Sequence, residues 1–205
     1  MKACIWLLDD DAGIRDSLSW LLASLDWEVR SFAEPEAFLQ EIAATALQPG
    51  CLLLDIRMPG MTGLEVLEEV GVRAQGLPVI IITGHADVPL AVAALKAGAF
   101  DFVEKPFNDD QLLARINQAV RLHQSYLDRV KGQEAQERLW LTLTPREQEV
   151  MRQLVQGLTA REIAEALAIS PKTVDVHRHH LLQKMQVRSL AELIHAGYRL
   201  GLLSQ

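Results

Sequence analysis

Apolar and polar positions alternate differently in the two halves of the chain. In residues 1–125, five short apolar segments alternate with amphipathic stretches. The apolar segments are Ala3–Leu8, Glu28–Ser31, Cys51–Leu54, Pro78–Ile82 and Asp101–Val103. The amphipathic stretches lie near 12–26, 34–46, 63–72 and 87–98, and a last one begins near 108. This alternation predicts an α/β fold, a doubly wound five-stranded parallel sheet with helices on both faces.

The carboxyl ends of these predicted strands hold most of the candidate chemistry. The residues there are Asp9, Asp10, Asp11, Asp55, Thr83 and Lys105. Taken singly, each is an ordinary helix cap or surface group, and we expect Asp11 to cap a helix that begins near Ala12. Taken together, the carboxylates would repel one another unless a cation neutralised them. Oxygen ligands at a partly solvated sheet edge suit Mg²⁺, so the pattern predicts a magnesium site where open α/β sheets bind their ligands.

Three segments of this half resemble a known family. LLDDDAGIRDSL, LLLDIRMPGMTG and IIITGHADVPLAVAALKAGAFDFVEKPF are similar to the receiver domain of two-component response regulators of the FixJ/NarL type, and the last segment is especially FixJ-like. The resemblance covers residues 3–120. It implies the flavodoxin-like strand order and a phosphoryl transfer in which positioning and electrostatics carry most of the catalysis.

The resemblance also implies a phosphoryl acceptor and its metal ligands. Asp55 would attack the phosphohistidine of a sensor histidine kinase and become an acyl phosphate. Mg²⁺ would be held by Asp9, Asp10, Asp55 and the backbone carbonyl of Arg57. The protein itself would be no enzyme beyond this self-phosphorylation and its slow reversal.

Further residues take their expected roles from the same resemblance. Lys105 would pair with a phosphoryl oxygen. Thr83 would donate its hydroxyl to the phosphoryl group and so move its loop. Phe102 is either the aromatic switch of the family or an ordinary core residue. Arg57 and His85 would gate the approach of water to the acyl phosphate.

The segment PLAVAALKAGA, residues 89–99, predicts a helix that is apolar nearly all round. Val88, Val92 and Leu95 are expected to face the sheet, which leaves Leu90, Ala94 and Ala97 on the other side. A surface helix with apolar groups on both sides indicates a partner. We therefore expect phosphorylation to drive a homodimer through the 87–103 face, although the alanines alone would also favour a helix.

Residues 109–141 predict a helical connection. Apolar positions and one histidine recur at steps of three and four, at Leu112, Ile116, Val120, His123, Leu127 and Val130. We expect a helix from Asp109 to Lys131, interrupted at Gly132, and a looser segment to Trp140. The alternative is an ordinary last helix followed by a flexible linker. The expected organisation is a receiver domain over 1–120, a helical linker over 121–141 and a second domain over 142–205.

Four short helices are predicted in the second domain, three of them from their caps. Their expected bounds are Pro145–Gln156, Ala160–Ala168, Pro171–Gln186 and Leu190–Leu200. A short helix, a turn and a longer helix predict a helix-turn-helix. The segment LTPREQEVMRQLVQGLTAREIAEALAISPKTVDVHRHHLLQKMQVRSLAELI resembles the LuxR-type DNA-binding domain, which implies an all-α four-helix domain that binds double-stranded DNA.

Helical spacing divides the third of these helices into faces. Val174, Leu181, Leu182 and Met185 would point into the core. Lys172, Asp175, Val176, His179 and Gln183 would enter the major groove. Thr173, His177, Arg178, Lys184 and Arg188 are candidates for phosphate contacts, with His177 equally suited to helix packing. Asp175 replaces the basic residue often found at its place in the family, and would either accept from cytosine N4 or weaken binding.

Charge and composition add limits on partners and location. Residues 1–125 carry a net charge of −9 and residues 126–205 carry +2. A domain so weakly basic implies dimeric binding to paired half-sites. Without a run of eighteen apolar residues or a signal peptide, we expect a cytoplasmic protein with Cys4 and Cys51 as buried free thiols. Without an ATPase module, activation would require direct contact with RNA polymerase.

Three other functions compete with this interpretation. An Mg²⁺-dependent phosphohydrolase with an aspartate nucleophile is disfavoured by Arg57, which stands where such enzymes carry a second aspartate, and by the helix-turn-helix. A dinucleotide-binding enzyme lacks the GxGxxG after the first strand. A protein-interaction adaptor that has lost DNA binding stays open on sequence alone.

Overall fold

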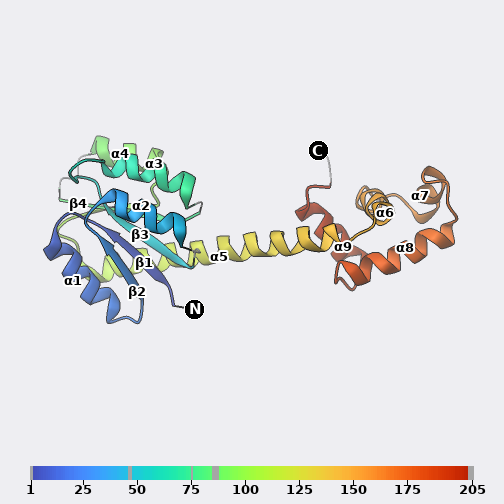
Figure 1. The fold of residues 1–205 in the computed structure, drawn as a ribbon, viewed down its shortest axis with the longest axis horizontal. Coiled ribbons are helices and arrows are strands. Elements are labelled where there is room, and N and C mark those ends of the chain that lie inside the picture. The colour runs from blue at the N-terminus through green and yellow to red at the C-terminus, as the bar shows by residue number, and fades with distance from the viewer. Residues whose placement is uncertain (1, 46–47, 75, 85–87, 203–205) are drawn as a thin grey trace. The chain divides into compact units, whose positions relative to one another are not determined.

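A computed structural model describes residues 2–45, 48–74, 76–84 and 88–202 (Figure 1). The chain divides into two compact units, Met1–Asp128 and Arg129–Gln205. Each unit has its own apolar core. None of the described helices is both long enough and apolar enough to cross a membrane.

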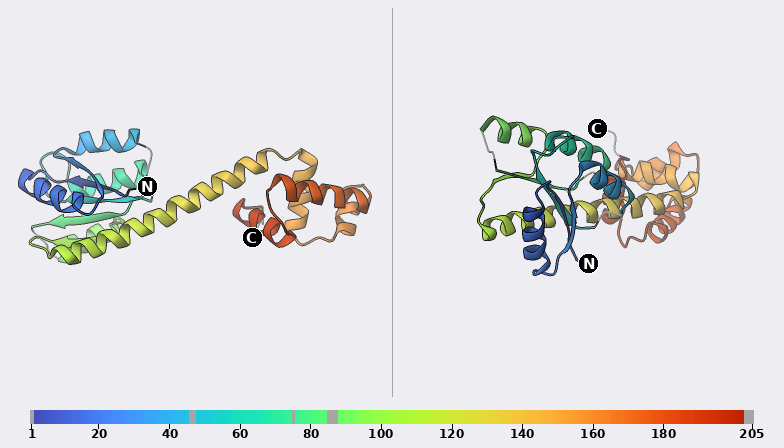
Figure 2. Two further views of the ribbon diagram at one scale, coloured as in Figure 1. Left: turned by 90° about the horizontal axis from the view of Figure 1, so that it is seen from below. Right: turned by 60° about the vertical axis from the view of Figure 1, so that its left-hand side comes forward.

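The first unit contains a five-stranded sheet. Its strands are β1 (Cys4–Leu8), β2 (Glu28–Phe32), β3 (Gly50–Asp55), β4 (Val79–Thr83) and β5 (Asp101–Glu104). All neighbouring pairs are parallel, in the order β2-β1-β3-β4-β5, which confirms the predicted fold. The three central strands are buried along their whole length, because helices cover both faces of the sheet (Figure 2).

Five helices follow the strands: α1 (Ala12–Ala23), α2 (Pro35–Ala44), α3 (Gly63–Arg73), α4 (Val88–Lys96) and α5 (Asp109–Leu141). Alternate strand residues point to opposite faces. Trp6 and Leu54 therefore join the core beneath α2, α3 and α4, whereas Ile5 and Leu53 join the core with α1 and the first part of α5. Asp11 caps α1, as predicted, since its carboxylate accepts from the backbone N–H groups of Gly13 and Ile14.

The orientation of α4 differs from the prediction. Val88, Val92 and Leu95 are 77%, 43% and 50% exposed, whereas Ala94 is fully buried and Leu90 packs against the core. The predicted assignment of the two faces was therefore wrong. Counting large apolar side chains misplaced the buried stripe, because a helix can approach a sheet closely on small residues such as alanine.

Helix α5 also differs from the prediction, because it continues through Gly132 to Leu141 without a looser segment. One glycine inside a helix costs only about 1 kcal/mol relative to alanine. Its neighbours are strong helix formers, and side-chain pairs Gln133–Glu137 and Glu134–Arg138 span the following turns.

The second unit contains the end of α5 and four further helices, α6 (Pro145–Val155), α7 (Ala160–Ala166), α8 (Pro171–Lys184) and α9 (Leu190–Arg199). Thr144, Thr159 and Ser170 cap the first three, as predicted, and Ser189 caps the fourth. The core between them includes Val150, Leu154, Ile163, Val174, Leu181, Met185 and Leu193.

The four tryptophans occupy different environments. Trp6 is buried, stacks on Phe32 and carries the Arg30 guanidinium 5.3 Å from its ring centroid. Trp20 on α1 is 78% exposed, whereas Trp27 and Trp140 are half-buried. The Arg152 guanidinium lies 5.1 Å from the Trp140 ring centroid.

Candidate functional site

A buried ionic cluster lies at the carboxyl ends of β1, β3 and β5. The Lys105 Nζ donates to Asp9 Oδ2 at 2.6 Å and to Asp55 Oδ1 at 3.1 Å. The side chains of Asp9 and Asp55 are 3% and 8% exposed. The sequence-predicted acceptor, one predicted metal ligand and the predicted lysine are thus in direct contact.

Backbone groups hold the two carboxylates in place. The Asp11 N–H donates to Asp9 Oδ1 at 2.9 Å, and the Arg57 N–H donates to Asp55 Oδ2 at 2.8 Å. The Arg15 guanidinium donates to the carbonyl oxygens of Asp9 and Asp10, at 2.8 and 2.9 Å. Arg15 therefore fixes the loop after β1, a role that its position in the sequence did not predict.

Asp10, Arg57 and Thr83 line the same hollow. Its described lining consists of Asp9, Asp10, Asp11, Ile14, Asp55, Arg57, Thr83, Gly84 and Lys105. Thr83 is buried at the end of β4, and Asp10 is exposed beside the buried pair. His85 lies outside the described residues. Phe102 is half-buried against the core, a position open to either of its two predicted interpretations.

The electrostatics of the cluster are unbalanced. Among the described residues, Lys105 is the one cation in ion-pair contact with the two buried carboxylates. Burial raises the pKa of Asp55, and the opposing effect of Lys105 does not fully compensate. Burial would lower the pKa of Lys105, but the hydrogen bonds and charges of Asp9 and Asp55 raise it above its ordinary value.

These residues fit a hard divalent cation that keeps part of its water shell. Two buried carboxylates and the exposed carboxylate of Asp10 line one hollow, and all are oxygen donors. No cluster of three or more described acidic, histidine or cysteine side chains is close enough to enclose a metal by itself. Mg²⁺ is typically bound by one or two carboxylates together with waters and phosphate oxygens, so it does not need such an enclosure.

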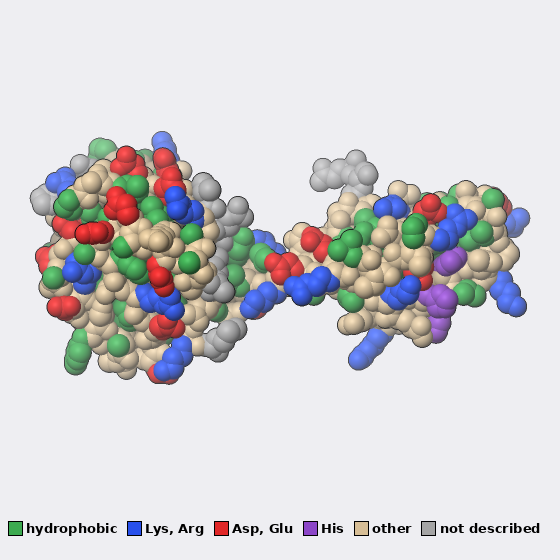
Figure 3. Space-filling view, in the orientation of Figure 1, with side chains coloured by type: hydrophobic (Ala, Val, Ile, Leu, Met, Phe, Trp, Pro, Cys, Tyr) green, Lys and Arg blue, Asp and Glu red, His purple; other side chains and the backbone are tan. Residues whose placement is uncertain are grey.

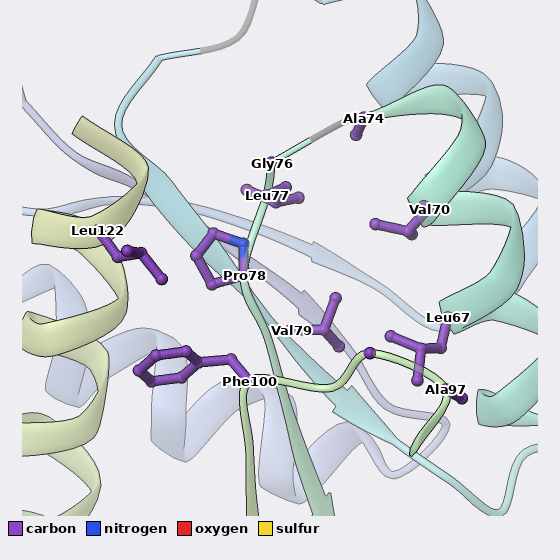
Figure 4. Close-up of a pocket in the computed structure, with 12 residues that line it drawn as sticks. Leu67, Val70, Ala74, Gly76, Leu77, Pro78, Val79, Ala97, Phe100 and Leu122 are labelled. Atoms are coloured by element: carbon purple, nitrogen blue, oxygen red, sulfur yellow. The ribbon is translucent and has the colours of Figure 1, made fainter. Parts of the chain in front are cut away.

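A second hollow lies at the opposite end of the sheet (Figure 4). Leu122 on α5, Pro78 before β4 and Phe100 before β5 lie around it, and every described residue that lines it is apolar. Its lining side chains therefore offer no acid, base or metal ligand.

In the second unit, α8 presents the predicted exposed face. The side chains of Lys172, Asp175, Val176, His179 and Gln183 are exposed. Val174, Leu181 and Met185 are buried, and Leu182 is partly buried against the core. Figure 3 shows histidine side chains together with Lys and Arg on one side of this unit.

Some of the predicted phosphate contacts have partners within the unit. The Lys184 Nζ donates to Glu147 Oε2 at 2.7 Å, and Glu147 is only 3% exposed. This ion pair gives Lys184 a structural partner, and its phosphate contact stays a prediction. Thr173 lies in the cap of α8, where its hydroxyl contacts that of Ser170 at 2.8 Å. His177 is half-buried, and its Nδ1 has no hydrogen-bond partner among the described residues.

Two buried polar residues were missed from the sequence. Glu147 forms a capping box with Thr144, and its TxxE spacing was visible, although its burial and its lysine partner were not. His123 is fully buried, and its Nδ1 accepts from the Gly50 N–H at 3.1 Å. In the sequence it is only one member of an apolar stripe.

The first unit is a doubly wound sheet with an acidic cluster at one edge, and the second unit is a set of short helices with an exposed polar face on α8. The receiver domain of response regulators matches residues 5–117, and the luxR family of bacterial regulatory proteins matches residues 141–196. The chain therefore belongs to the two-component response regulators, as a transcription factor with a receiver and a LuxR-type DNA-binding domain. This finding confirms the predicted family and decides against the phosphohydrolase.

Individual relatives match along the whole chain. The transcriptional regulatory protein FixJ of Bradyrhizobium diazoefficiens is 43% identical over 204 residues, covering 99% of this chain and 98% of the relative. The C4-dicarboxylate transport transcriptional regulatory protein DctR of Rhodobacter capsulatus is 44% identical over 195 residues, covering 94% and 98%. The structure of the response regulator StyR matches with a TM-score of 0.85 and 40% identity, over 97% of this chain and 100% of that one.

Proposed function

We propose that Asp55 accepts a phosphoryl group from the phosphohistidine of a sensor histidine kinase, with Mg²⁺ held by Asp9, Asp10, Asp55 and the backbone carbonyl of Arg57. The observation that carries this proposal is the pair of buried carboxylates sharing one ammonium. When bound, Mg²⁺ supplies the positive charge that balances the carboxylates and the incoming phosphoryl oxygens.

Three residues of the chain would take part in the phosphoryl transfer itself. Asp55 attacks phosphorus with an Oδ atom, and the bond from phosphorus to the histidine nitrogen of the donor breaks. Lys105, already in contact with Asp55, pairs with a phosphoryl oxygen. Thr83, at the end of the neighbouring strand, donates its hydroxyl to another oxygen and draws its loop toward the site.

Phosphate labelling tests this assignment. The full chain is incubated with acetyl phosphate and Mg²⁺, and incorporation is measured by mass. We expect labelling of the wild type, none of Asp55→Asn, and none of the wild type when EDTA replaces Mg²⁺. Glu68→Gln is the control, since Glu68 is an exposed carboxylate on α3 and should label normally. Equal labelling of Asp55→Asn and wild type would overturn the assignment.

We further propose that phosphorylation drives homodimerisation through the 87–103 face. Val92 and Leu95 form an exposed apolar strip on α4, which follows the Thr83 strand end in the chain. A two-fold contact there would be isologous. Sedimentation with beryllofluoride and Mg²⁺ should show a dimer for the wild type and a monomer for Leu95→Glu. Leu25→Glu, at a similarly exposed site, is the control.

The exposed face of α8 is proposed to read promoter DNA as paired half-sites, next to RNA polymerase. In a gel shift, Lys172→Ala should weaken binding to all duplexes and reduce its salt dependence, as expected of a lost phosphate contact at the start of this face. Asp175→Ala and His179→Ala should instead change the preference among operator variants. A uniform loss for all three would contradict this division. Partners of this kind imply a cytoplasmic protein.

A further inference from the structure

One carboxylate in the second unit collects an unusual number of donors. Glu147 Oε2 accepts from the Thr144 N–H at 2.8 Å, from the Thr144 hydroxyl at 3.0 Å and from Lys184 Nζ at 2.7 Å. His180 Nδ1 lies 3.8 Å from the other oxygen, Oε1. The Glu147 side chain is 4% exposed, so water screens these contacts poorly.

These donors come from separate parts of the fold. Thr144 is the cap of α6, three residues after the end of α5, whereas Lys184 is the last residue of α8 and His180 lies one turn before it. Glu147 therefore joins the start of α6 to the last turns of α8. The contact is long-range in sequence, and it acts on the helix whose exposed face carries Lys172, Asp175 and His179.

The geometry leaves Lys184 poorly placed to bind DNA. If its ammonium moved to a phosphate, Glu147 would remain as a buried carboxylate held by the two Thr144 donors, with His180 Nδ1 3.8 Å from Oε1. The Glu147 side chain is 4% exposed and that of Lys184 is 38% exposed, so water screens this pair less than an exposed one, and losing it costs more. The charge of Lys184 is therefore used inside the unit, unlike that of Lys172, which is exposed at the start of the same helix.

We infer that Lys184 and Glu147 are positioning residues for DNA recognition: their ion pair holds α8 in the orientation that presents its exposed face, and Lys184 contacts no phosphate. The inference rests on the proposed role of α8 in reading DNA. It assigns Lys184 to specificity rather than to the general attraction between basic side chains and the DNA backbone.

The test uses the full chain activated with beryllofluoride and Mg²⁺. Two duplexes of equal length serve as probes, one selected by the wild type from a random pool and one unselected. Kd is measured against salt concentration, well below the unfolding temperature, for the wild type, Lys184→Met, Lys184→Arg and the phosphate-contact control Lys172→Ala. Circular dichroism establishes that each variant is folded. Lys184→Gln replaces Lys184→Met if the latter does not fold.

For Lys184→Met we expect the ratio of selected to unselected affinity to fall at least about tenfold, the size of one lost hydrogen bond to a charged group. The slope of log Kd against log salt concentration should equal that of the wild type. Lys184→Arg should restore the ratio of selected to unselected affinity. Lys172→Ala should lower the slope by about one.

Three results would overturn the inference. A slope reduced by about one in Lys184→Met would make Lys184 a phosphate contact. An unchanged ratio in the folded variant would reduce the pair to a contributor to stability alone, and a ratio that Lys184→Arg fails to restore would exclude the charge as the cause. If the wild type selects no sequence from the pool, it is the proposed DNA-reading function itself that fails.

Discussion

The receiver unit and the DNA-binding unit each contain a buried ionic cluster of one lysine with one or two carboxylates, but the two clusters differ in charge balance and in access to solvent. In the receiver unit, Lys105 is shared by Asp9 and Asp55, and the cluster opens into a hollow. In the DNA-binding unit, Lys184 is directed at Glu147 alone, and Thr144 donors complete the hydrogen bonding of that carboxylate. The first cluster has an excess of negative charge, whereas the second is balanced.

The pKa shifts of the two carboxylates follow from this difference. Burial raises the pKa of Asp55, because one shared ammonium does not fully offset it. Burial would also raise the pKa of Glu147, but hydrogen bonds from Lys184 and Thr144 outweigh it and lower the pKa. Ionised Asp55 thus opposes folding and ionised Glu147 favours it. The Asp55 cluster, which we propose binds a cation and a phosphoryl group, therefore lowers the stability of the first unit while both are absent.

The largest effect is expected from neutralising Glu147. Glu147→Gln should lower the free energy of unfolding of the second unit by about 3 kcal/mol, since the buried acceptor of the hydrogen bonds from Lys184 and Thr144 loses its charge. Because the folded pKa is lowered, this contribution is present above the ordinary glutamate pKa and is lost as pH falls through the folded value. Urea unfolding at pH 7 and in acid measures the loss of unfolding free energy and its dependence on pH. Glu149→Gln, exposed on the same helix, is the control.

Magnesium should act on the receiver cluster alone. At one hundred times its Kd, Mg²⁺ should stabilise the first unit by about 2.7 kcal/mol, raising its Tm. Asp10→Asn and Asp9→Asn should reduce this shift, and Glu147→Gln should retain it. Thermal unfolding with and without MgCl₂ gives the comparison. An equal shift in all variants would place the ion elsewhere.

Neutralising Asp55 should have the opposite sign to neutralising Glu147. Without Mg²⁺, Asp55→Asn should raise the free energy of unfolding of the first unit by about 1–2 kcal/mol, because one ammonium then serves one carboxylate. The raised pKa means that the wild type loses this stability as pH rises through the folded pKa of Asp55. Chemical unfolding at pH 7 tests it, and a less stable Asp55→Asn would show that the cluster is not under charge strain.

The smallest effect concerns His123, which is buried and has no ionic partner among the described residues. Burial lowers its pKa, and its Nδ1 accepts from the Gly50 N–H, so the folded ring is neutral. Stability should therefore be full above the ordinary histidine pKa and fall as pH drops below it, by less than about 1.4 kcal/mol per pH unit. His123→Gln should flatten this dependence between pH 7 and pH 5. An unchanged slope would exclude His123 as its source.

How far the sequence predicted this structure depends on the kind of signal. The strands and the Asp55 edge were predictable because apolar runs and strand-end carboxylates are local patterns. The facing of α4 was not, because the burial of Ala94 and the exposure of Leu95 depend on how closely the helix packs. The partners of Lys184 and His123 were not predictable for a related reason, since Glu147 and Gly50 are remote from them in sequence. Gly132 failed as a helix breaker because its neighbours sustain the helix.

The arrangement of the tryptophans has a practical consequence for optical measurements. Trp6, Trp20 and Trp27 belong to the first unit, and Trp140 is the one tryptophan of the sequence after residue 128. The emission of a Trp140→Phe variant would report the first unit alone, and subtracting it from the wild-type signal would isolate the second. Quenching by iodide should act first on Trp20, the most exposed ring, and least on the buried Trp6. The two units can thus be followed separately in one unlabelled chain.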